Sequence, residues 1–130
     1  MTEKPLISII DDDPFMRDSI RQLIKSFGYT VATFSSALAF LESPDLKQTS
    51  CLIADVQMPG MTGDELYGRL VHDGRGIPTI LVTAYPNDRL RARVLSDGVV
   101  CYLTKPFDQQ NLMTCVRKAL ELRSPAGEAS

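Results

Sequence analysis

Three carboxylates, a hydroxyl and a lysine stand where the apolar, strand-forming runs of this sequence end. Asp55 closes the run Leu52-Ile53-Ala54, and a turn rich in Gly and Pro follows it at once. The comparable positions beside other apolar runs are held by Asp11, Asp12, Thr83 and Lys105. Asp is a favoured turn residue, so Asp55 alone could do no more than begin its turn. The chemistry of these side chains therefore depends on whether the fold brings them together.

Segments typical of strands and of helices alternate along the chain. Short apolar runs predict five strands, at residues 6–10, 30–34, 51–55, 77–83 and 99–103. Apolar residues at helical spacing predict helices between and after them, at about residues 14–27, 36–43, 63–73, 87–96 and 108–123. Residues 45–50 are polar and are expected to form a loop. This alternation predicts one α/β domain, residues 1–123, with a parallel sheet covered by helices on both faces.

The carboxyl ends of parallel strands meet at one edge of the sheet, where ligands bind in open α/β folds. Asp11, Asp12 and Asp55 would crowd together there, and their repulsion would drive one toward protonation unless a positive charge compensates it. Mg2+ prefers oxygen ligands, and a backbone carbonyl of the turn after Asp55 can add one. Lys105 can pair with Asp55 at rest and, like the Thr83 hydroxyl, with a phosphoryl oxygen later. Because carboxylates can form aspartyl-phosphates, these residues predict a phosphoryl-accepting site.

Composition excludes several classes of protein. The 130 residues suffice for one domain, and a formal net charge of −2 argues against a general nucleic-acid binder. Cys51, Cys101 and Cys115 fall in or beside apolar runs without CxxC spacing, so we expect all three to be buried and reduced. With no signal region or apolar run of membrane length, a soluble, cytoplasmic protein that does not contact the membrane is expected. Residues 124–130 have the composition of a flexible tail or of the start of a linker.

Four blocks of sequence carry the residues considered above. They are Ile9-Ile10-Asp11-Asp12-Asp13, Asp55-Val56-Gln57-Met58-Pro59-Gly60-Met61-Thr62-Gly63, Thr83-Ala84 and Lys105-Pro106-Phe107. In this order and spacing, the chain resembles a response-regulator receiver domain, the CheY-like domain of two-component signalling, over residues 5–123. The subgroup that it resembles most is the FixJ/NarL type of transcriptional regulator. The resemblance implies a doubly wound, flavodoxin-like sheet of strand order 2-1-3-4-5.

The resemblance also assigns roles to individual residues. Asp55 would accept a phosphoryl group from a sensor histidine kinase, and Thr83 and Lys105 would bind the attached group. The ligands implied for Mg2+ are Asp11, Asp12, Asp55 and the backbone carbonyl of Gln57. Asp13, which precedes Pro14, is expected to cap the following helix and not to bind the ion. Tyr102, three residues before Lys105, matches the aromatic switch position, which would turn inward once Thr83 moves toward the phosphoryl oxygens.

This switch would reshape the face formed by the helix at 87–96, the strand at 99–103 and the last helix. Arg89, Arg91 and Arg93 lie on that face, as a solvated basic surface or as part of a phosphorylation-dependent homodimer. Acidic groups that they could meet are Asp97, Asp108 and Glu121. Family resemblance alone places kinase docking at Phe15, Met16, Arg21 and Pro106. DNA binding would need an output domain absent from this chain.

Two residues could set how long the phosphoryl group lasts. Gln57 lies two residues after Asp55, and Tyr85 lies two residues after Thr83, so both should flank the path of an attacking water. We expect the bulky Tyr85 and the neutral Gln57 to slow hydrolysis, since neither is an acid well placed to orient that water. The segment Gly98-Val99-Val100-Cys101 stands where the family usually has a small Ala. This difference indicates tighter or shifted packing between the helix at 87–96 and the strand that follows, which bears on the dimer geometry and not on the site.

Alternative functions remain open at this point. A stand-alone phosphorelay or kinase-sequestering protein would show the same site without a DNA-binding output. A Mg2+-dependent phosphatase would also use acid pairs, Thr and Lys, but it generally needs a second acid shortly after the nucleophile, where this chain has Gln57. A receiver-like module used only for binding would not need all of these residue types. His72 lies among polar residues and is expected to be exposed and inert.

Overall fold

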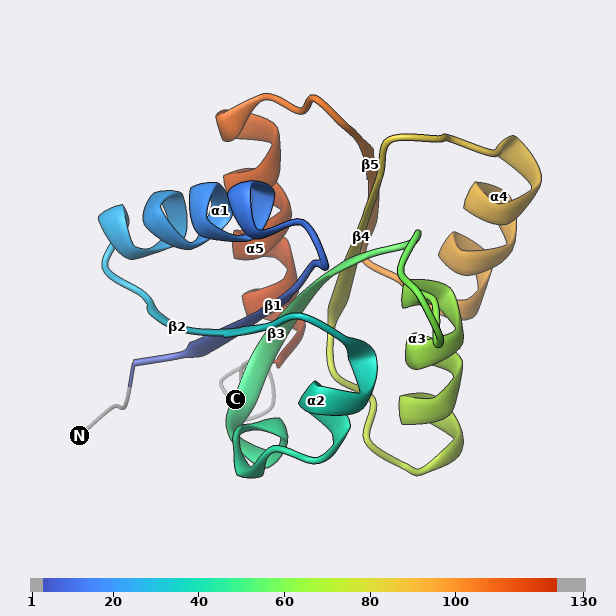
Figure 1. The fold of residues 1–130 in the computed structure, drawn as a ribbon, viewed down its shortest axis with the longest axis horizontal. Coiled ribbons are helices and arrows are strands. Elements are labelled where there is room, and N and C mark those ends of the chain that lie inside the picture. The colour runs from blue at the N-terminus through green and yellow to red at the C-terminus, as the bar shows by residue number, and fades with distance from the viewer. Residues whose placement is uncertain (1–3, 124–130) are drawn as a thin grey trace.

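A five-stranded parallel sheet forms the centre of the molecule (Figure 1). The computed structural model describes residues 4–123. The strands are β1 (Leu6–Ile10), β2 (Thr30–Phe34), β3 (Thr49–Asp55), β4 (Thr79–Thr83) and β5 (Cys101–Thr104). All neighbouring strands pair in parallel, and their order is β2-β1-β3-β4-β5. The expected α/β class and strand order are therefore confirmed.

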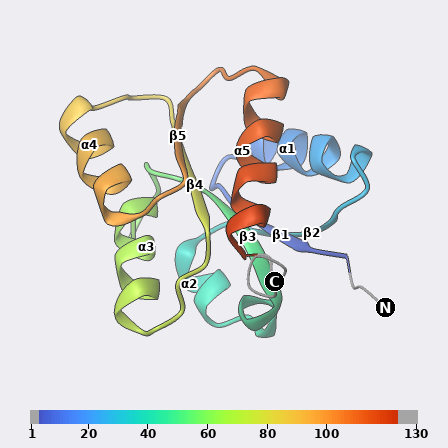
Figure 2. The ribbon, with the colours of Figure 1, turned by 180° about the vertical axis from the view of Figure 1, so that it is seen from behind.

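Helices cover both faces of this sheet (Figures 1 and 2). They are α1 (Pro14–Ser26), α2 (Ala37–Leu41), α3 (Gly63–His72), α4 (Asp88–Asp97) and α5 (Gln109–Arg123). Helices α1 and α5 lie together on one face, over a core that includes Ile9 and Ile53. Helices α2, α3 and α4 cover the other face, over a second core that includes Leu52 and Leu81. Within residues 4–123, no helix combines the length and apolar composition that a membrane span requires.

The expected loop at residues 45–50 is wrong. A short 3₁₀-helix, η1 (Pro44–Gln48), occupies most of it, and β3 already begins at Thr49. The Ser43 side chain caps η1 by accepting a hydrogen bond from the Asp45 N–H at 3.0 Å. Thr49 is buried, and its hydroxyl is satisfied at 2.7 Å by Ser8 on the neighbouring strand. The polar composition of this segment suggested a solvent-exposed loop, but a polar residue such as Thr49 can be buried when its hydroxyl is hydrogen-bonded within the fold.

The prediction of three reduced cysteines is wrong for two of them. Cys101 on β5 and Cys115 on α5 form a disulfide, with their Cα atoms 6.2 Å apart. That separation is within the range that a disulfide can bridge. The residues are 14 positions apart and show no motif, so only the packing of α5 against β5 brings them together. Cys51 is free and fully buried, as predicted, and burial raises the pKa of its thiol to about 12.

Helix α3 begins directly against the end of β3. Thr62 and Glu65 form a reciprocal capping box, each side chain bonding the other's backbone N–H. Gly63, the first helical residue, donates its N–H to the carbonyl of Val56 at 3.1 Å. A Cβ atom added at Gly63 would overlap the backbone carbonyl of Asp55. Glycine is therefore required here by close packing, which fixes the backbone of Asp55 against the helix.

Two glycines of α3 should respond in opposite ways to alanine substitution. Gly63→Ala should lower the free energy of unfolding by about 1–3 kcal/mol, because the new methyl group meets rigid backbone. Gly68→Ala should raise it by about 0.5–1 kcal/mol, because nothing lies within 4 Å of the added methyl and alanine favours the helix. Urea unfolding of the two variants measures both changes. Equal effects would contradict the proposed contact between Gly63 and the Asp55 carbonyl.

Candidate functional site

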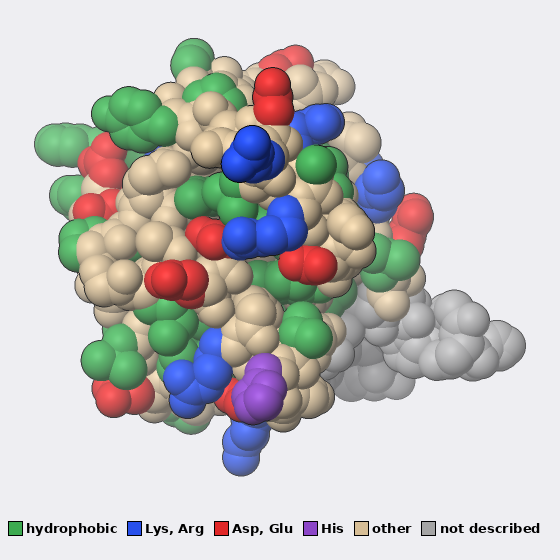
Figure 3. Space-filling model, turned by 90° about the vertical axis from the view of Figure 1, so that its right-hand side faces the viewer, with side chains coloured by type: hydrophobic (Ala, Val, Ile, Leu, Met, Phe, Trp, Pro, Cys, Tyr) green, Lys and Arg blue, Asp and Glu red, His purple; other side chains and the backbone are tan. Residues whose placement is uncertain are grey.

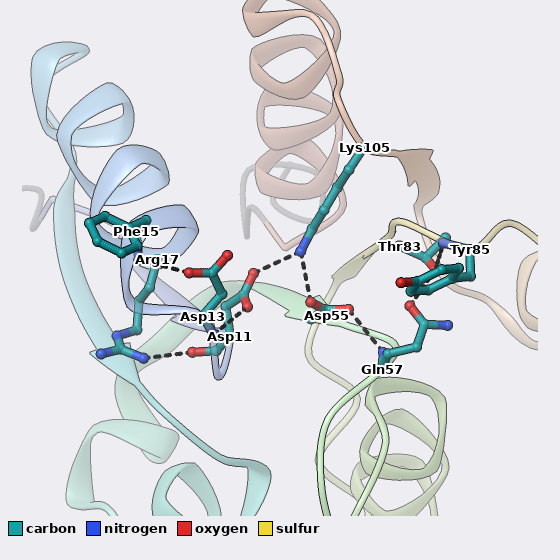
Figure 4. A network of polar contacts seen from close by, with 9 residues as sticks. All are labelled: Asp11, Asp13, Phe15, Arg17, Asp55, Gln57, Thr83, Tyr85 and Lys105. Carbon is teal, nitrogen blue, oxygen red and sulfur yellow. Dashed lines mark hydrogen bonds and ion pairs between the residues drawn. The ribbon is translucent and has the colours of Figure 1, made fainter.

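The five side chains singled out in the sequence meet at one edge of the sheet: Figure 4 shows Asp11, Asp55, Thr83 and Lys105 there, and Asp12 lies beside Asp11 and Asp55. β1 ends just before Asp11 and Asp12, β3 ends at Asp55, and β4 ends at Thr83. Thr104, the last residue of β5, pairs in register with Thr83, so Lys105 follows at the same edge. Parallel strands and their register thus bring together residues that are up to 94 positions apart. The predicted convergence of these residues is confirmed.

The three carboxylates form a compact acidic cluster. One ligand oxygen from each of Asp11, Asp12 and Asp55 lies within 4.8 Å of the others. Asp11 and Asp55 are buried, whereas Asp12 is exposed. Burial raises the pKa of Asp11, although hydrogen bonds from the Asp13 N–H and from Lys105 oppose the shift. An oxygen-only donor set with crowded negative charge is suited to a hard metal cation.

Lys105 supplies the positive charge that this cluster requires. Its Nζ lies 2.7 Å from Asp55 Oδ2 and 3.0 Å from Asp11 Oδ2. Burial by itself would lower the pKa of Lys105, but the hydrogen bonds to Asp55 and Asp11 outweigh burial and raise the pKa above its usual value. The ammonium group therefore stays charged and bridges two strand ends. The Lys105–Pro106 peptide bond that follows is cis.

Asp13 has a different role from its two acidic neighbours. Its side chain accepts a hydrogen bond from the Phe15 N–H at 3.0 Å and caps α1, with Pro14 at the first helical position. Its own N–H donates to Asp11 Oδ1 at 2.9 Å. The Arg17 guanidinium donates to the Asp11 carbonyl at 2.7 Å. The prediction that Asp13 is a helix cap is confirmed, and the start of α1 holds Asp11 in place.

Gln57 links the end of β3 to the end of β4. Its backbone N–H donates to Asp55 Oδ1 at 2.9 Å, and its side-chain Oε1 lies 2.5 Å from the Thr83 hydroxyl. The Thr83 hydroxyl also accepts a hydrogen bond from the Tyr85 N–H at 2.9 Å. The sequence indicated only a backbone-carbonyl role for Gln57 and a place beside the path of an attacking water. The register of β3 and β4, which places Asp55 opposite Val82, is the signal that could have indicated a Gln57–Thr83 contact.

Tyr102 already lies inside the molecule. Its side chain is buried, and its hydroxyl accepts a hydrogen bond at 3.1 Å from the N–H of Asn87, the N-cap of α4. The resemblance implied that this ring turns inward only after Thr83 binds a phosphoryl group. Here the ring is inward while Thr83 is bonded to Gln57, so the ring connects β5 to α4 in this state. Strand periodicity could not reveal this orientation, because it depends on where α4 begins.

The surface around α4 carries three arginines in different settings. Arg93 forms a salt bridge with Asp64 of α3 at 3.0 Å. Arg89 and Arg91 are exposed and form no salt bridge with any of residues 4–123. Figure 3 looks onto the side of the molecule where α3 and α4 lie and shows basic and acidic side chains interspersed there. This surface is therefore mixed in charge.

The remaining predicted residues lie at the surface. Phe15 is 85% exposed, and Met16 and Pro106 border a shallow pocket between α1 and the start of α5. Arg21 is paired with Asp18 at 2.6 Å. Tyr85 is 73% exposed. His72 is exposed, as expected, and lies at the end of α3.

Comparisons with known proteins identify the family. The model of the response regulator receiver domain matches residues 7–117. The transcriptional regulatory protein FixJ of Bradyrhizobium diazoefficiens is 34% identical over 99% of this chain, and TmoT of Ectopseudomonas mendocina is 33% identical over 92%. The chain spans only 63% and 54% of those two proteins. The structure of the response regulator StyR, 35% identical, superposes with a TM-score of 0.88 over 98% of this chain and 64% of StyR. The chain whose strand ends converge in this way belongs to the response regulator receiver family.

Proposed function

We propose that Asp55 accepts a phosphoryl group from the phosphohistidine of a sensor histidine kinase. Receiver domains are signalling switches, and the observation that carries this assignment is the double ion pair of Lys105 with Asp55 and Asp11. Lys105 holds a fixed positive charge beside a nearly buried carboxylate at the edge of the sheet. In the reaction, an Asp55 oxygen forms the new P–O bond while the P–N bond breaks, and the departing imidazole nitrogen takes up a proton from solvent.

The acidic cluster suits Mg2+ as the cofactor. Asp11, Asp12, Asp55 and the backbone carbonyl of Gln57 would hold the ion, which would supply charge neutralisation for the transferring phosphoryl oxygens. Lys105 can move one of its hydrogen bonds from a carboxylate to a phosphoryl oxygen. The Thr83 hydroxyl can donate to a second oxygen. These two side chains would orient the group and offset the charge of roughly −1.5 to −2 that it adds.

Phosphorylation would be signalled by a change in the face that α4, β5 and α5 form. Thr83 is two residues from Tyr85 in the loop that leads to α4, and Tyr102 on β5 bonds the N-cap of α4. A change of partner at Thr83 is thus next to both elements. We assign residues 1–123 to the receiver, followed by a linker to an output domain, because the chain spans 54–63% of two regulators that it resembles. The whole protein would regulate transcription in the cytoplasm, and only its output domain would contact DNA. Residues 124–130 lie outside the described part of the chain.

Phosphorylation of Asp55 is tested directly by incubation with acetyl phosphate and Mg2+, followed by intact mass. We expect one added phosphoryl group, which is not gained when a chelator has removed Mg2+ beforehand and is absent in Asp55→Asn. Asp73→Asn, which changes an exposed carboxylate at the far end of α3, should accept the group normally. If Asp55→Asn accepts the group as well as the parent does, Asp55 is not the acceptor.

Tyr85 should prolong the life of the phosphoryl group. Its backbone N–H is bonded to Thr83, and its large side chain is 73% exposed beside the site, where it can obstruct an incoming water. After the donor is removed, Tyr85→Ala should lose the phosphoryl group severalfold faster than the parent, whereas Tyr85→Phe, which keeps the ring, should match the parent. The decay of the phosphorylated mass over time measures this. A Tyr85→Ala lifetime no shorter than that of the parent would refute the proposal.

Phosphorylation should also produce a homodimer through the exposed arginines of α4. The phosphorylated protein should elute as a dimer in size-exclusion chromatography, and Arg89→Glu with Arg91→Glu should keep it monomeric by placing like charges opposite acidic groups. Any change in dimerisation caused by Arg93→Glu should come from the loss of a salt bridge within the chain, because Arg93 already pairs with Asp64. Arg75→Glu, at the opposite edge of the sheet, is the matched control. A phosphorylated parent that remains monomeric contradicts this interface.

A further inference from the structure

The Thr83 hydroxyl both donates and accepts a hydrogen bond in this structure. It accepts a hydrogen bond from the Tyr85 N–H at 2.9 Å and lies 2.5 Å from Gln57 Oε1. A hydroxyl has a single proton, and a carbonyl oxygen can only accept, so that proton is donated to Gln57. Thr83 is 0% exposed and therefore has no access to bulk water as an alternative acceptor.

Gln57 is the mobile partner of this bond. Its side chain is exposed, so it can swing into water and satisfy its amide there, whereas Thr83 is a buried, β-branched residue at the end of a central strand. Gln57 is also tied through its backbone N–H to Asp55 Oδ1 at 2.9 Å. A single residue therefore contacts both the carboxylate that would be modified and the hydroxyl that would respond.

We propose that Gln57 is a positioning residue that accepts the hydrogen bond of the Thr83 hydroxyl at rest. It must give up this bond when a phosphoryl oxygen becomes the acceptor in its place. This inference rests on the proposed function, because the competing acceptor is the group attached to Asp55. The Gln57 side chain then opposes the phosphorylated state by the strength of one partly buried hydrogen bond. Its amide oxygen acts through Thr83 and does not touch the reacting atoms.

Equilibrium binding of beryllium fluoride, a phosphoryl analogue that is not hydrolysed, tests this competition without the complication of turnover. At saturating Mg2+, Gln57→Met should bind the analogue about three- to tenfold more tightly than the parent, because methionine keeps the length of the side chain but offers Thr83 no carbonyl. In a Thr83→Val background, the same substitution should change the affinity by less than about twofold. Isothermal titration calorimetry measures all four proteins.

Two controls separate this effect from a general one. Gln48→Met removes an exposed amide at the end of η1, at the opposite edge of the sheet, and should leave the affinity unchanged. Thr83→Ala provides a second background for the cycle if Thr83→Val lowers the stability of the protein. Thermal unfolding of each variant confirms that the comparison is between folded proteins.

The outcomes distinguish the two proposals. A gain in affinity that requires the Thr83 hydroxyl supports the Gln57 contact as a competitor. An equal gain in both backgrounds, no gain, or a loss would overturn it, while binding by the parent would leave the proposed function standing. If the parent binds no beryllium fluoride with Mg2+ and gains no phosphoryl group, the proposed function fails, and this inference fails with it.

Discussion

The site depends on one electrostatic arrangement, the contact of a single ammonium group with two carboxylates at the ends of adjacent strands. Asp11 and Asp55 are buried side by side, and each would be costly to keep charged without a partner. Lys105 reaches both within 3.0 Å. Because it follows β5, the outermost strand, this lysine connects that strand to the ends of β1 and β3 at the centre of the sheet. Any group that changes the charge at Asp55 must change the hydrogen bonds of Lys105.

The chain order of the strands makes this arrangement possible. In the order β2-β1-β3-β4-β5, the central strand β3 lies between β1 and β4, so Asp55 has Asp11 on one side and Thr83 on the other. This much could be predicted from the sequence, since apolar runs alternate with helical spacing and each relevant run stops at a polar residue. Element ends were less predictable where hydroxyls are buried: Thr49 looked like loop, yet it begins β3 because Ser8 satisfies it.

Side-chain orientation marks the limit of sequence reasoning within the site. Asp11, Asp12, Asp55, Thr83 and Lys105 were all located from residue type and position alone. The Gln57–Thr83 contact, the inward Tyr102 ring and the Cys101–Cys115 bridge were not, because each joins two elements whose relative placement no local pattern encodes. Convergence of strand ends follows from topology, but a contact between particular atoms depends on packing.

Asp55 is thereby connected to its surroundings in two chemically different ways. On one side the connection is charge, through Lys105 to Asp11 and to the turn after β5. On the other side it consists of hydrogen bonds to groups that carry no net charge, from Asp55 through Gln57 and Thr83 to the Tyr85 backbone, in the loop that leads to α4. The Tyr102 hydroxyl joins the two sides by bonding α4 to β5. Charge acts over longer distances than a hydrogen bond, which needs a direct contact and a specific geometry. A new charge at Asp55 would therefore act on the β5 side by attraction to Lys105, but on the α4 side only by replacing Gln57 at the Thr83 hydroxyl.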